Sequence, residues 1–503
     1  MRRSGVLMAV SSLPGKYGIG CFSKEAYKFV DDLKEAGQSL WQILPLGPTS
    51  YGDSPYQSFS TFAGNPYFID PDTLIAKKWL TKRDCESYDW GKDETRVDYA
   101  KIYYSRFKLL RRAYKRSKIA SDRGFLRFIK ANAFWLPDYA LFMALKDAHG
   151  GKSWETWEKP LRFREKAAID EARRKYADDI GFYEFIQYEF SLEWKELKKY
   201  ANKQGIEIVG DIPIYVAFDS ADAWANPKLF EFDEELRPVA VAGCPPDAFS
   251  ADGQLWGNPL YRWDVHKKSG YAWWMKRIEN CFKLYDVVRI DHFRGFDEYY
   301  RIPYPAENAR NGKWMKGPGF DLFKVMKRKL GEKQVIAEDL GFLTPSVLKL
   351  VTRTGYPGMK VLQFAFDPRE ESDYLPQNYV RNSVVYTGTH DNDTTLSWYY
   401  DISARDRRFA AEYLNIPKDA KDKDIPWYFI RSAYASVSDT AVIPMQDILS
   451  LPHETRMNHP STIGGNWQWR MKEGAFKNPV KKKLLRLTEL YGRAQKPNKS
   501  KKR

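Results

Sequence analysis

Eight short apolar runs, spread over the whole length of the chain, constrain its fold more than any other feature. They are Gly5–Val10, Leu40–Leu46, Ile206–Tyr215, Leu284–Asp291, Gln334–Leu340, Met359–Phe366, Ser383–Thr389 and Thr440–Gln446. Short apolar and β-branched runs of this kind are typical of strands that are buried in a parallel sheet. Because helical patterns lie between several of them, we predict an α/β fold, a (β/α)8 barrel of the TIM type.

Helix signals between the runs support this interpretation. Ser23–Ala36 carries an apolar stripe and stops at Gly37, a residue type that commonly follows the last turn of a helix. Ile186–Gln204 repeats the pattern, and a third helix is expected to begin at Thr344 and to end at Gly355. The chain therefore alternates between strand and helix periodicity, as a barrel requires.

The spacing of the units is uneven. Between the second and third runs, residues 66–205 are mostly charged and helical in character, with few strand signals. We expect this segment to be a mostly helical insertion that caps one end of the barrel. The barrel domain, with its insertions, is expected over residues 1–492, and the polar, basic segment 493–503 is expected to be a disordered tail.

The charge of the chain first suggests an acidic partner. The 503 residues have a formal net charge of +16, but Lys477–Arg503 holds eleven Lys or Arg residues against the single acid Glu489 and so supplies +10 of it. The positive charge is thus concentrated at one end, and no nucleic-acid-binding motif accompanies it. A nucleic-acid-binding protein is the weaker alternative, and we expect no nucleic-acid partner.

The spacing of the cysteines and the length of the apolar runs indicate the cellular compartment. The four cysteines lie far apart and form no C-x-x-C or metal-binding spacing, which indicates reduced thiols. The apolar run after Met1 is too short for a secretory signal, and no segment approaches 18 unbroken apolar residues. We therefore expect a cytoplasmic protein with no membrane partner.

Charged side chains follow four of the predicted strands at the point where each strand ends. They are Asp211, Arg289, Asp291, Glu338, His390 and Asp391. In a barrel of this type the chemistry lies at the C-terminal edge of the strands, so four strands would bring carboxylates to one rim. Two chemistries fit: a divalent metal held by carboxylates, or the cleavage of a glycosidic bond by one ionised and one protonated acid.

Arg289 favours the second chemistry. It lies two residues before Asp291, so in an extended strand both side chains project from the same face. The guanidinium is expected to lower the pKa of Asp291 by roughly 1–3 units, and an ionised carboxylate suits a nucleophile. The same positive charge would compete with a metal ion, so we expect neither a metal nor a cofactor.

Two choices stay open on the residues alone. Glu338 and Asp339 are neighbours that point to opposite faces of a strand, so periodicity cannot say which of them faces the site. His292 and His390 fit the site, and both also fit the description of buried core histidines.

Several motifs together resemble one family. Arg289–Gly295 (R-I-D-H-F-R-G), Ala337–Gly341 (A-E-D-L-G) and Thr389–Asp393 (T-H-D-N-D) resemble conserved regions of the amylomaltases. These are the 4-α-glucanotransferases, or disproportionating enzymes, of the α-amylase-like clan. Further matches are Ser11–Pro14, Leu44–Pro48, Ser54–Ser58, Gly210–Tyr215, Gly243–Asp247 and Arg456–Asn458. The matches occur in order along most of the chain, which makes the resemblance more specific than any single motif.

The resemblance implies a role for each rim residue. Asp291 would be the nucleophile, Glu338 the general acid and base, and Asp391 the carboxylate that binds sugar hydroxyls and stabilises the transition state. The implied substrate-binding residues are Arg289, which would orient Asp291, the buried acid Asp211, the hydroxyl donor His390, and the groove residues Ser54, Tyr56, Asp247, Gln254, Trp256 and Asn458.

The implied activity is that of a retaining 4-α-glucanotransferase, which cleaves an α-1,4-glucan through a covalent glycosyl-enzyme. The donors would be α-1,4-glucans and maltooligosaccharides, and the acceptor would be glucose or another maltooligosaccharide. An α-1,4-glucan hydrolase with the same carboxylates is the alternative. We interpret Gly243–Pro259 as a groove-lining loop that carries Trp256, and this loop favours transfer over hydrolysis.

Overall fold

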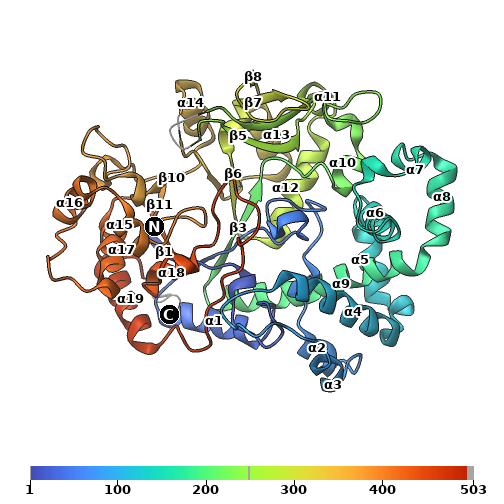
Figure 1. The fold of residues 1–503 in the computed structure, drawn as a ribbon, viewed down its shortest axis with the longest axis horizontal. Helices are drawn as coiled ribbons and strands as arrows, with labels where there is room; N and C mark the ends of the chain where they lie inside the picture. Colours follow the sequence, from blue (N-terminus) through green and yellow to red (C-terminus); the bar gives the residue numbers. More distant parts are fainter. Residues whose placement is uncertain (1, 247–249, 342, 495–503) are drawn as a thin grey trace, which may run out of the picture.

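Eight parallel strands form the centre of the molecule, as a computed structural model that describes residues 2–246, 250–341 and 343–494 shows (Figure 1). The strands are β1 (Arg3–Leu7), β2 (Leu40–Gln42), β3 (Glu207–Pro213), β6 (Val287–Asp291), β9 (Val335–Ala337), β10 (Gly358–Val361), β11 (Ser383–Tyr386) and β12 (Thr440–Pro444). Their order in the sheet is β10-β11-β12-β1-β2-β3-β6-β9. The Ala337 N–H at the end of β9 donates to the Pro357 carbonyl just before β10, so the sheet closes into the predicted barrel.

Each of the eight apolar runs overlaps one of these strands, which confirms the predicted fold class. The strands are shorter than the runs, because the C-terminal part of each run turns away from the ladder at the rim. The run Leu40–Leu46, for example, pairs as a strand only to Gln42, and its Pro45 has no N–H to donate to a neighbouring strand.

The predicted helices are also present. Helix α1 (Lys24–Glu35) begins after Ser23, whose hydroxyl accepts the Glu25 N–H at 3.3 Å, and ends before Gly37 at φ 73°. Helix α14 (Pro345–Thr354) ends at Gly355, as predicted. Helix α9 (Ala177–Lys203) begins earlier than the prediction of residue 186, because buried aromatic residues such as Phe182 extend its apolar face.

A large helical region lies between β2 and β3, on the right of Figure 1. It consists of α2 (Pro71–Ala76), α3 (Lys82–Glu86), α4 (Tyr99–Ser117), α5 (Arg123–Ala131), α6 (Leu136–Ala148), α7 (Lys159–Arg162), α8 (Lys166–Lys175) and α9. Helix α9 returns the chain to the barrel, where the Trp194 indole donates to the Leu284 carbonyl at 3.0 Å just before β6. The helical region is thereby fixed to the barrel wall.

A second sheet of four antiparallel strands, which the sequence did not predict, lies beside the barrel rim at the top of Figure 1. Its strands are β4 (Ala240–Cys244), β5 (Gln254–Pro259), β7 (Glu298–Pro303) and β8 (Lys313–Lys316), in the order β5-β4-β7-β8. The interpretation of Gly243–Pro259 as a loop is therefore wrong for both of its ends. Gly243 permits the close pairing, because a Cβ atom there would lie 2.1 Å from the Gln254 carbonyl oxygen.

Further helices complete the layer around the barrel. They are α10 (Ala221–Ala225), α11 (Trp263–Lys268), α12 (Ala272–Leu284), α13 (Phe320–Leu330), α15 (Thr395–Asp401), α16 (Ala404–Tyr413), α17 (Ile425–Ala435), α18 (Met445–Ile448) and α19 (Asn478–Leu490). Among the described residues, no helix is long and apolar enough to cross a membrane.

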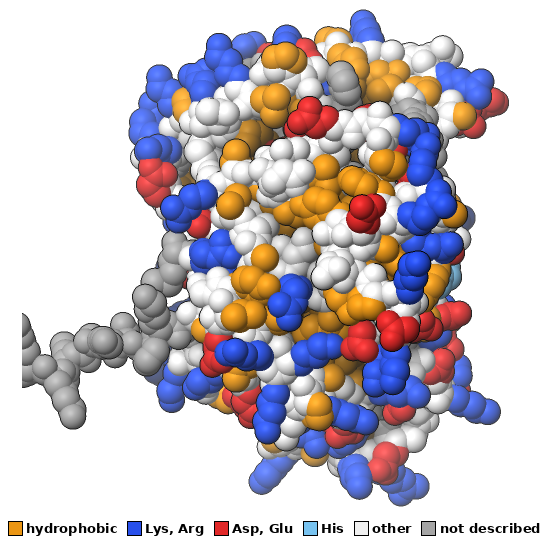
Figure 2. Space-filling model, turned by 90° about the vertical axis from the view of Figure 1, so that its left-hand side faces the viewer, with side chains coloured by type: hydrophobic (Ala, Val, Ile, Leu, Met, Phe, Trp, Pro, Cys, Tyr) orange, Lys and Arg blue, Asp and Glu red, His pale blue; other side chains and the backbone are white. Residues whose placement is uncertain are grey.

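Figure 2 shows the side of the molecule that carries α15 and α16. Lys and Arg side chains lie mainly around its margins and lower part, with Asp and Glu side chains among them. Hydrophobic side chains occupy a band through the middle. Among the described residues of this face, acids and the hydrophobic band interrupt the basic side chains.

The chain end differs from the prediction at one residue. Arg493, which we expected to begin the disordered tail, is only 1% exposed. Its guanidinium donates to the carbonyl oxygens of Tyr434 at 2.9 Å, Ser438 at 2.9 Å and Arg3 at 3.1 Å, and so joins α17, the start of β12 and β1. Sequence polarity could not reveal this burial, because the partners are main-chain atoms. The residues from 495 onward lie outside the described part of the chain.

These contacts predict that Arg493 and the residues beyond it contribute very differently to stability. Arg493→Ala would leave several buried carbonyls without a donor, so we expect it to lower the free energy of unfolding by about 2–3 kcal/mol. Deletion of Lys496–Arg503 should leave the melting temperature and the activity nearly unchanged. Thermal denaturation of both variants checks this, and a deletion as destabilising as the substitution would contradict it.

Candidate active site

The C-terminal edge of the barrel brings together the charged residues that follow its strands. Asp211 lies in β3 and pairs in register with Arg289 of β6, while Pro213 pairs with Asp291. Glu338 directly follows β9, and its backbone N–H donates to the Ile290 carbonyl at 3.1 Å. The rim therefore places the ends of β3, β6 and β9 side by side, as the sequence predicted.

Arg289 is the centre of this arrangement. Its Nη1 atom donates to both carboxylate oxygens of Asp211, at 2.8 and 2.7 Å, and lies 3.0 Å from Asp291 Oδ1. Asp211 is fully buried and Arg289 is 3% exposed, whereas the Asp291 side chain is 30% exposed. One buried guanidinium thus holds two carboxylates, and only Asp291 is open to a substrate.

The same geometry bears on the metal alternative. A carboxylate-bound cation would need the space between Asp211 and Asp291, and Arg289 Nη1 occupies it. The donor set of these strands therefore fits an internal ion pair and does not fit a divalent metal. Within the described ranges, no group of three or more His, Cys, Asp or Glu residues has metal-binding geometry.

The environment of Asp291 corrects one expectation. Burial within the rim, together with the nearby carboxylates, raises the pKa of Asp291 above its ordinary value, although the Arg289 guanidinium acts in the opposite direction. The sequence-based expectation that Arg289 would bring this pKa below its ordinary value is therefore wrong for the free site. Arg289 offsets the cost of burial instead of exceeding it.

Glu338 is held by main-chain donors. Its Oε2 accepts the His292 N–H at 2.7 Å, and its Oε1 accepts the Leu340 N–H at 2.8 Å. Burial, with the nearby Asp291 charge, raises the pKa of Glu338 to about 7. An acid with this pKa can hold a proton near neutral pH and can release it during a reaction.

The neighbouring acid, Asp339, has a structural role. Its Oδ1 accepts the Met359 N–H at 2.7 Å, and its carboxylate fills the space in which a Cβ atom at position 358 would lie. Asp339 therefore joins the end of β9 to the start of β10 and does not face the rim. The choice that periodicity left open falls to Glu338.

The third carboxylate, Asp391, follows β11. Its Oδ1 accepts from Asn458 Nδ2 at 2.6 Å, and its Oδ2 lies 3.4 Å from His390 Nε2. The His390 ring stacks on Tyr56, with ring centroids 5.1 Å apart and planes at 17°. Because the Tyr56 hydroxyl donates to Asp211 at 2.9 Å, this side of the rim is connected to the Arg289 pair.

His292 is the histidine that the sequence left undecided between site and core. It adopts φ 51°, and this turn directs its backbone N–H toward Glu338. Its ring packs edge-on against Trp256, with centroids 4.8 Å apart, and burial lowers its pKa to about 3. His292 is therefore an uncharged packing residue that also supports Glu338 through its main chain.

The residues that were expected to line the groove make different contacts in the structure. Trp256 is half-buried on β5, and its indole donates to Gln254 Oε1 at 3.0 Å, so these two side chains fix each other. The Ser54 hydroxyl accepts the Tyr56 N–H at 3.2 Å and shapes the turn that carries Tyr56. Asp247 lies outside the described residues.

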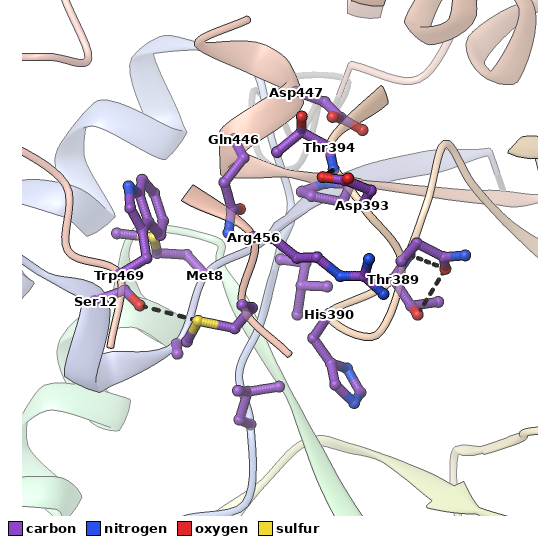
Figure 3. Close-up of a pocket in the computed structure, with 16 residues that line it drawn as sticks. Met8, Ser12, Thr389, His390, Asp393, Thr394, Gln446, Asp447, Arg456 and Trp469 are labelled. Carbon is purple, nitrogen blue, oxygen red and sulfur yellow. Dashed lines mark hydrogen bonds between the residues drawn. The ribbon is translucent and has the colours of Figure 1, made fainter. Parts of the chain in front are cut away.

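A pocket lined by both polar and apolar side chains lies next to His390, between the loops that follow β1, β11 and β12 (Figure 3). Arg456 crosses this pocket toward Thr389 and His390, and Asp393 lies above it. The sequence indicated Arg456 only as part of a motif, and it gave no role to Asp393 or to its ion-pair partner His453. These contacts join residues about sixty positions apart, so no local pattern could reveal them.

Known proteins match the chain over most of its length. Residues 8–476 match the glycoside hydrolase family 77 profile described as 4-alpha-glucanotransferase. The chain is 49% identical over 490 residues to a 4-alpha-glucanotransferase of Clostridium butyricum, which covers 97% of this chain and 100% of the relative. It is 48% identical over 484 residues to one of Thermus thermophilus, covering 94% and 95%.

Among solved structures, the amylomaltase of Streptococcus agalactiae in complex with acarbose superimposes with a TM-score of 0.96. That chain is 42% identical in sequence, and the match covers 98% of this chain and 100% of the other. The similarity therefore includes the barrel, the helical region and the rim.

Proposed function

The chain belongs to the 4-alpha-glucanotransferase family, glycoside hydrolase family 77, and on this premise we propose how its rim transfers a glycosyl group from one glucan to another. It is a 4-alpha-glucanotransferase, as its full-length relatives are. The alternative of a plain glucan hydrolase has no support in these relatives. The residue roles that follow are proposals that rest on the geometry.

Cleavage of the donor is the first step. Glu338 protonates the glycosidic oxygen as it leaves, and Asp291 attacks the anomeric carbon from the opposite side to form a covalent glycosyl-enzyme. The difference between the two carboxyl groups supports this assignment. Glu338 has a pKa of about 7 and can carry the proton, whereas Asp291 lies 3.0 Å from a guanidinium that favours its charged form.

Transfer to the acceptor is the second step. Glu338, now ionised, takes the proton from the 4-hydroxyl of the acceptor, and that oxygen attacks the anomeric carbon while the bond to Asp291 breaks. Two inversions restore the α configuration. The bond formed is of the same type as the bond cleaved, so the reaction needs no nucleotide, phosphate donor or other cofactor.

Asp391 and His390 are proposed to bind the hydroxyl groups of the sugar that reacts. Asn458 holds one oxygen of Asp391, and the other oxygen faces His390 Nε2, so both side chains present polar atoms in a fixed geometry. Arg289 and Asp211 support Asp291 from below, and Tyr56 joins them to His390. This buried framework keeps the hydroxyl-binding residues rigid relative to the nucleophile.

The proposed donors are α-1,4-glucans and maltooligosaccharides, and the proposed acceptors are glucose and maltooligosaccharides. The similar S. agalactiae structure is a complex with acarbose, which supports a sugar-binding rim. We propose that Trp256 forms the acceptor side, because its ring is half-buried beside His292, which in turn holds Glu338. Aromatic rings in such positions pack on the C–H faces of sugars.

A cytoplasmic location without nucleic-acid or membrane partners is also proposed. Cys21, Cys85 and Cys281 are buried thiols, which is compatible with a reducing compartment. The basic residues of the face in Figure 2 are interleaved with acids and surround a hydrophobic band.

The acid role of Glu338 predicts a specific pH dependence. Glu338 must be protonated to assist a sugar leaving group, so kcat/KM for maltotriose should fall about tenfold per unit above a pH of about 7. A separate fall at acidic pH is expected where Asp291 becomes protonated, because the nucleophile must be ionised. With α-glucosyl fluoride as donor, fluoride leaves without protonation. The rate of donor cleavage should then no longer fall above a pH of about 7. Steady-state rates over a pH series check both. If the fall in rate above a pH of about 7 were the same for both donors, it would have to come from the titration of a group other than Glu338.

The acceptor role of Trp256 predicts a change in product ratio. Trp256→Ala should raise the ratio of hydrolysis to transfer by about tenfold, the equivalent of losing about 1.4 kcal/mol of acceptor binding. Donor cleavage should fall much less. The measurement is the product distribution from maltotriose: longer oligosaccharides report transfer, and a rise in the total number of reducing ends reports hydrolysis, because transfer releases glucose or maltose without adding a reducing end.

Tyr304→Ala is the matched control, because Tyr304 is an exposed aromatic residue that follows β7 of the same sheet. Its ratio should equal that of the wild type. If Trp256→Ala left the ratio of hydrolysis to transfer unchanged, Trp256 would have only a packing role.

A further inference from the structure

Among the described residues, the hydrogen bonds that reach Asp391 from outside its own loop come from one short segment, residues 453–458. The Asn458 N–H donates to the His390 carbonyl at 3.1 Å, and Asn458 Nδ2 donates to Asp391 Oδ1 at 2.6 Å. At the other end of the segment, His453 Nδ1 lies 2.5 Å from Asp393 Oδ2. The orientation of Asp391 therefore depends on how well this segment is itself fixed.

Arg456 makes the connection between the two loops. Its Nη2 donates to the Asp391 carbonyl at 2.7 Å, and its Nε donates to the Asn458 carbonyl at 2.8 Å. The planar guanidinium fixes these two donors in one geometry, so it sets the main chain of Asp391 and the main chain of its partner Asn458 at the same time. Figure 3 shows Arg456 reaching across the pocket toward this loop.

Other contacts hold the rest of the two loops, and within its own loop the Asp391 N–H donates to the Thr389 hydroxyl at 3.3 Å. Gln446 Nε2 donates to the Thr455 carbonyl at 3.2 Å and anchors the segment to the end of β12. Gln363 Nε2 donates to the Asp393 carbonyl at 2.9 Å and anchors the β11 loop two residues past Asp391. These bonds hold the outer parts of the loops, while Arg456 holds the two residues whose side chains meet.

We infer that Arg456 is a positioning residue for glycosyl transfer, which sets the Asp391 carboxylate at the angle required for binding the sugar hydroxyls of the transition state. The inference rests on the role proposed above for Asp391. Arg456 itself need not touch the sugar, since both of its bonds go to main-chain carbonyls.

Arg493 offers a matched control. Like Arg456, it donates to main-chain carbonyls, but it is fully buried. Its partners are Arg3, Tyr434 and Ser438, which are not rim residues. A purely structural role for Arg456 predicts that Arg456→Ala and Arg493→Ala behave alike. A positioning role predicts that only Arg456→Ala lowers the kcat/KM of the folded enzyme.

The experiment compares kcat/KM for maltotriose, acarbose affinity by calorimetry and melting temperature in Arg456→Ala, Arg456→Lys, Arg493→Ala and Asp391→Ala. We expect Arg456→Ala to lose a factor on the order of 10 to 100 in kcat/KM and in acarbose affinity, since two charge-assisted hydrogen bonds are removed. Arg456→Lys should recover only part of it, because one ammonium cannot serve both carbonyls. Arg493→Ala should lower the melting temperature and keep kcat/KM within about twofold.

Two further measurements separate positioning from general damage. Added guanidinium at low millimolar concentration should restore part of the Arg456→Ala rate and none of any Arg493→Ala deficit. In the Asp391→Ala background, Arg456→Ala should cause little further loss of acarbose affinity, because its effect passes through Asp391. If Arg456→Ala does not fold, Arg456→Lys carries the same comparison.

Each opposite outcome has a distinct meaning. Wild-type kcat/KM in folded Arg456→Ala, or an undiminished additional loss in the Asp391→Ala background, would overturn the positioning role and leave the proposed function intact. Wild-type behaviour of Asp391→Ala alone would instead overturn the proposed role of Asp391.

Discussion

The rest of the site depends on one buried guanidinium, that of Arg289. Without it, Asp211 and Asp291 would be two neighbouring carboxylates at a water-poor strand edge, and removing one partner of such a buried pair typically costs about 3–5 kcal/mol. Arg289 makes their burial possible. The same contact network continues across the rim through Asp291, Arg289, Asp211, Tyr56, His390 and Asp391. The proposed nucleophile and the proposed hydroxyl-binding carboxylate therefore belong to one connected framework.

Two carboxylic acids on adjacent strands acquire different roles from their surroundings. Glu338 accepts from two main-chain N–H groups, and burial together with the charge of Asp291 raises its pKa to about 7. Asp291 is partly buried, and it shares the guanidinium of Arg289 with Asp211. This difference supports a proton carrier beside an anion, the pair that retaining cleavage needs.

The sequence predicted those features that follow from local pattern. Each of the eight apolar runs overlaps a barrel strand, and the polar residues at their ends meet at one rim because parallel strands share a direction. The antiparallel sheet was missed because its strands are short and include exposed residues such as Lys313 and Trp314. The pKa of Asp291 was given the wrong direction because burial is a property of the whole fold. Arg493 and Arg456 donate to main-chain carbonyls, and such contacts leave no pattern in the sequence.

The division of roles between Asp291 and Glu338 is tested most directly by changing the leaving group. With α-glucosyl fluoride as donor and azide as acceptor, Glu338→Ala should still form the glycosyl-enzyme, and azide should collect it as the α-glucosyl azide, because attack on the β-linked intermediate inverts the anomeric carbon a second time. Asp291→Asn lacks the attacking group, so no donor should restore its rate, which is expected to be several orders of magnitude below that of the wild type. Rescue of Asp291→Asn but not of Glu338→Ala would contradict the account, because it would reverse the two roles.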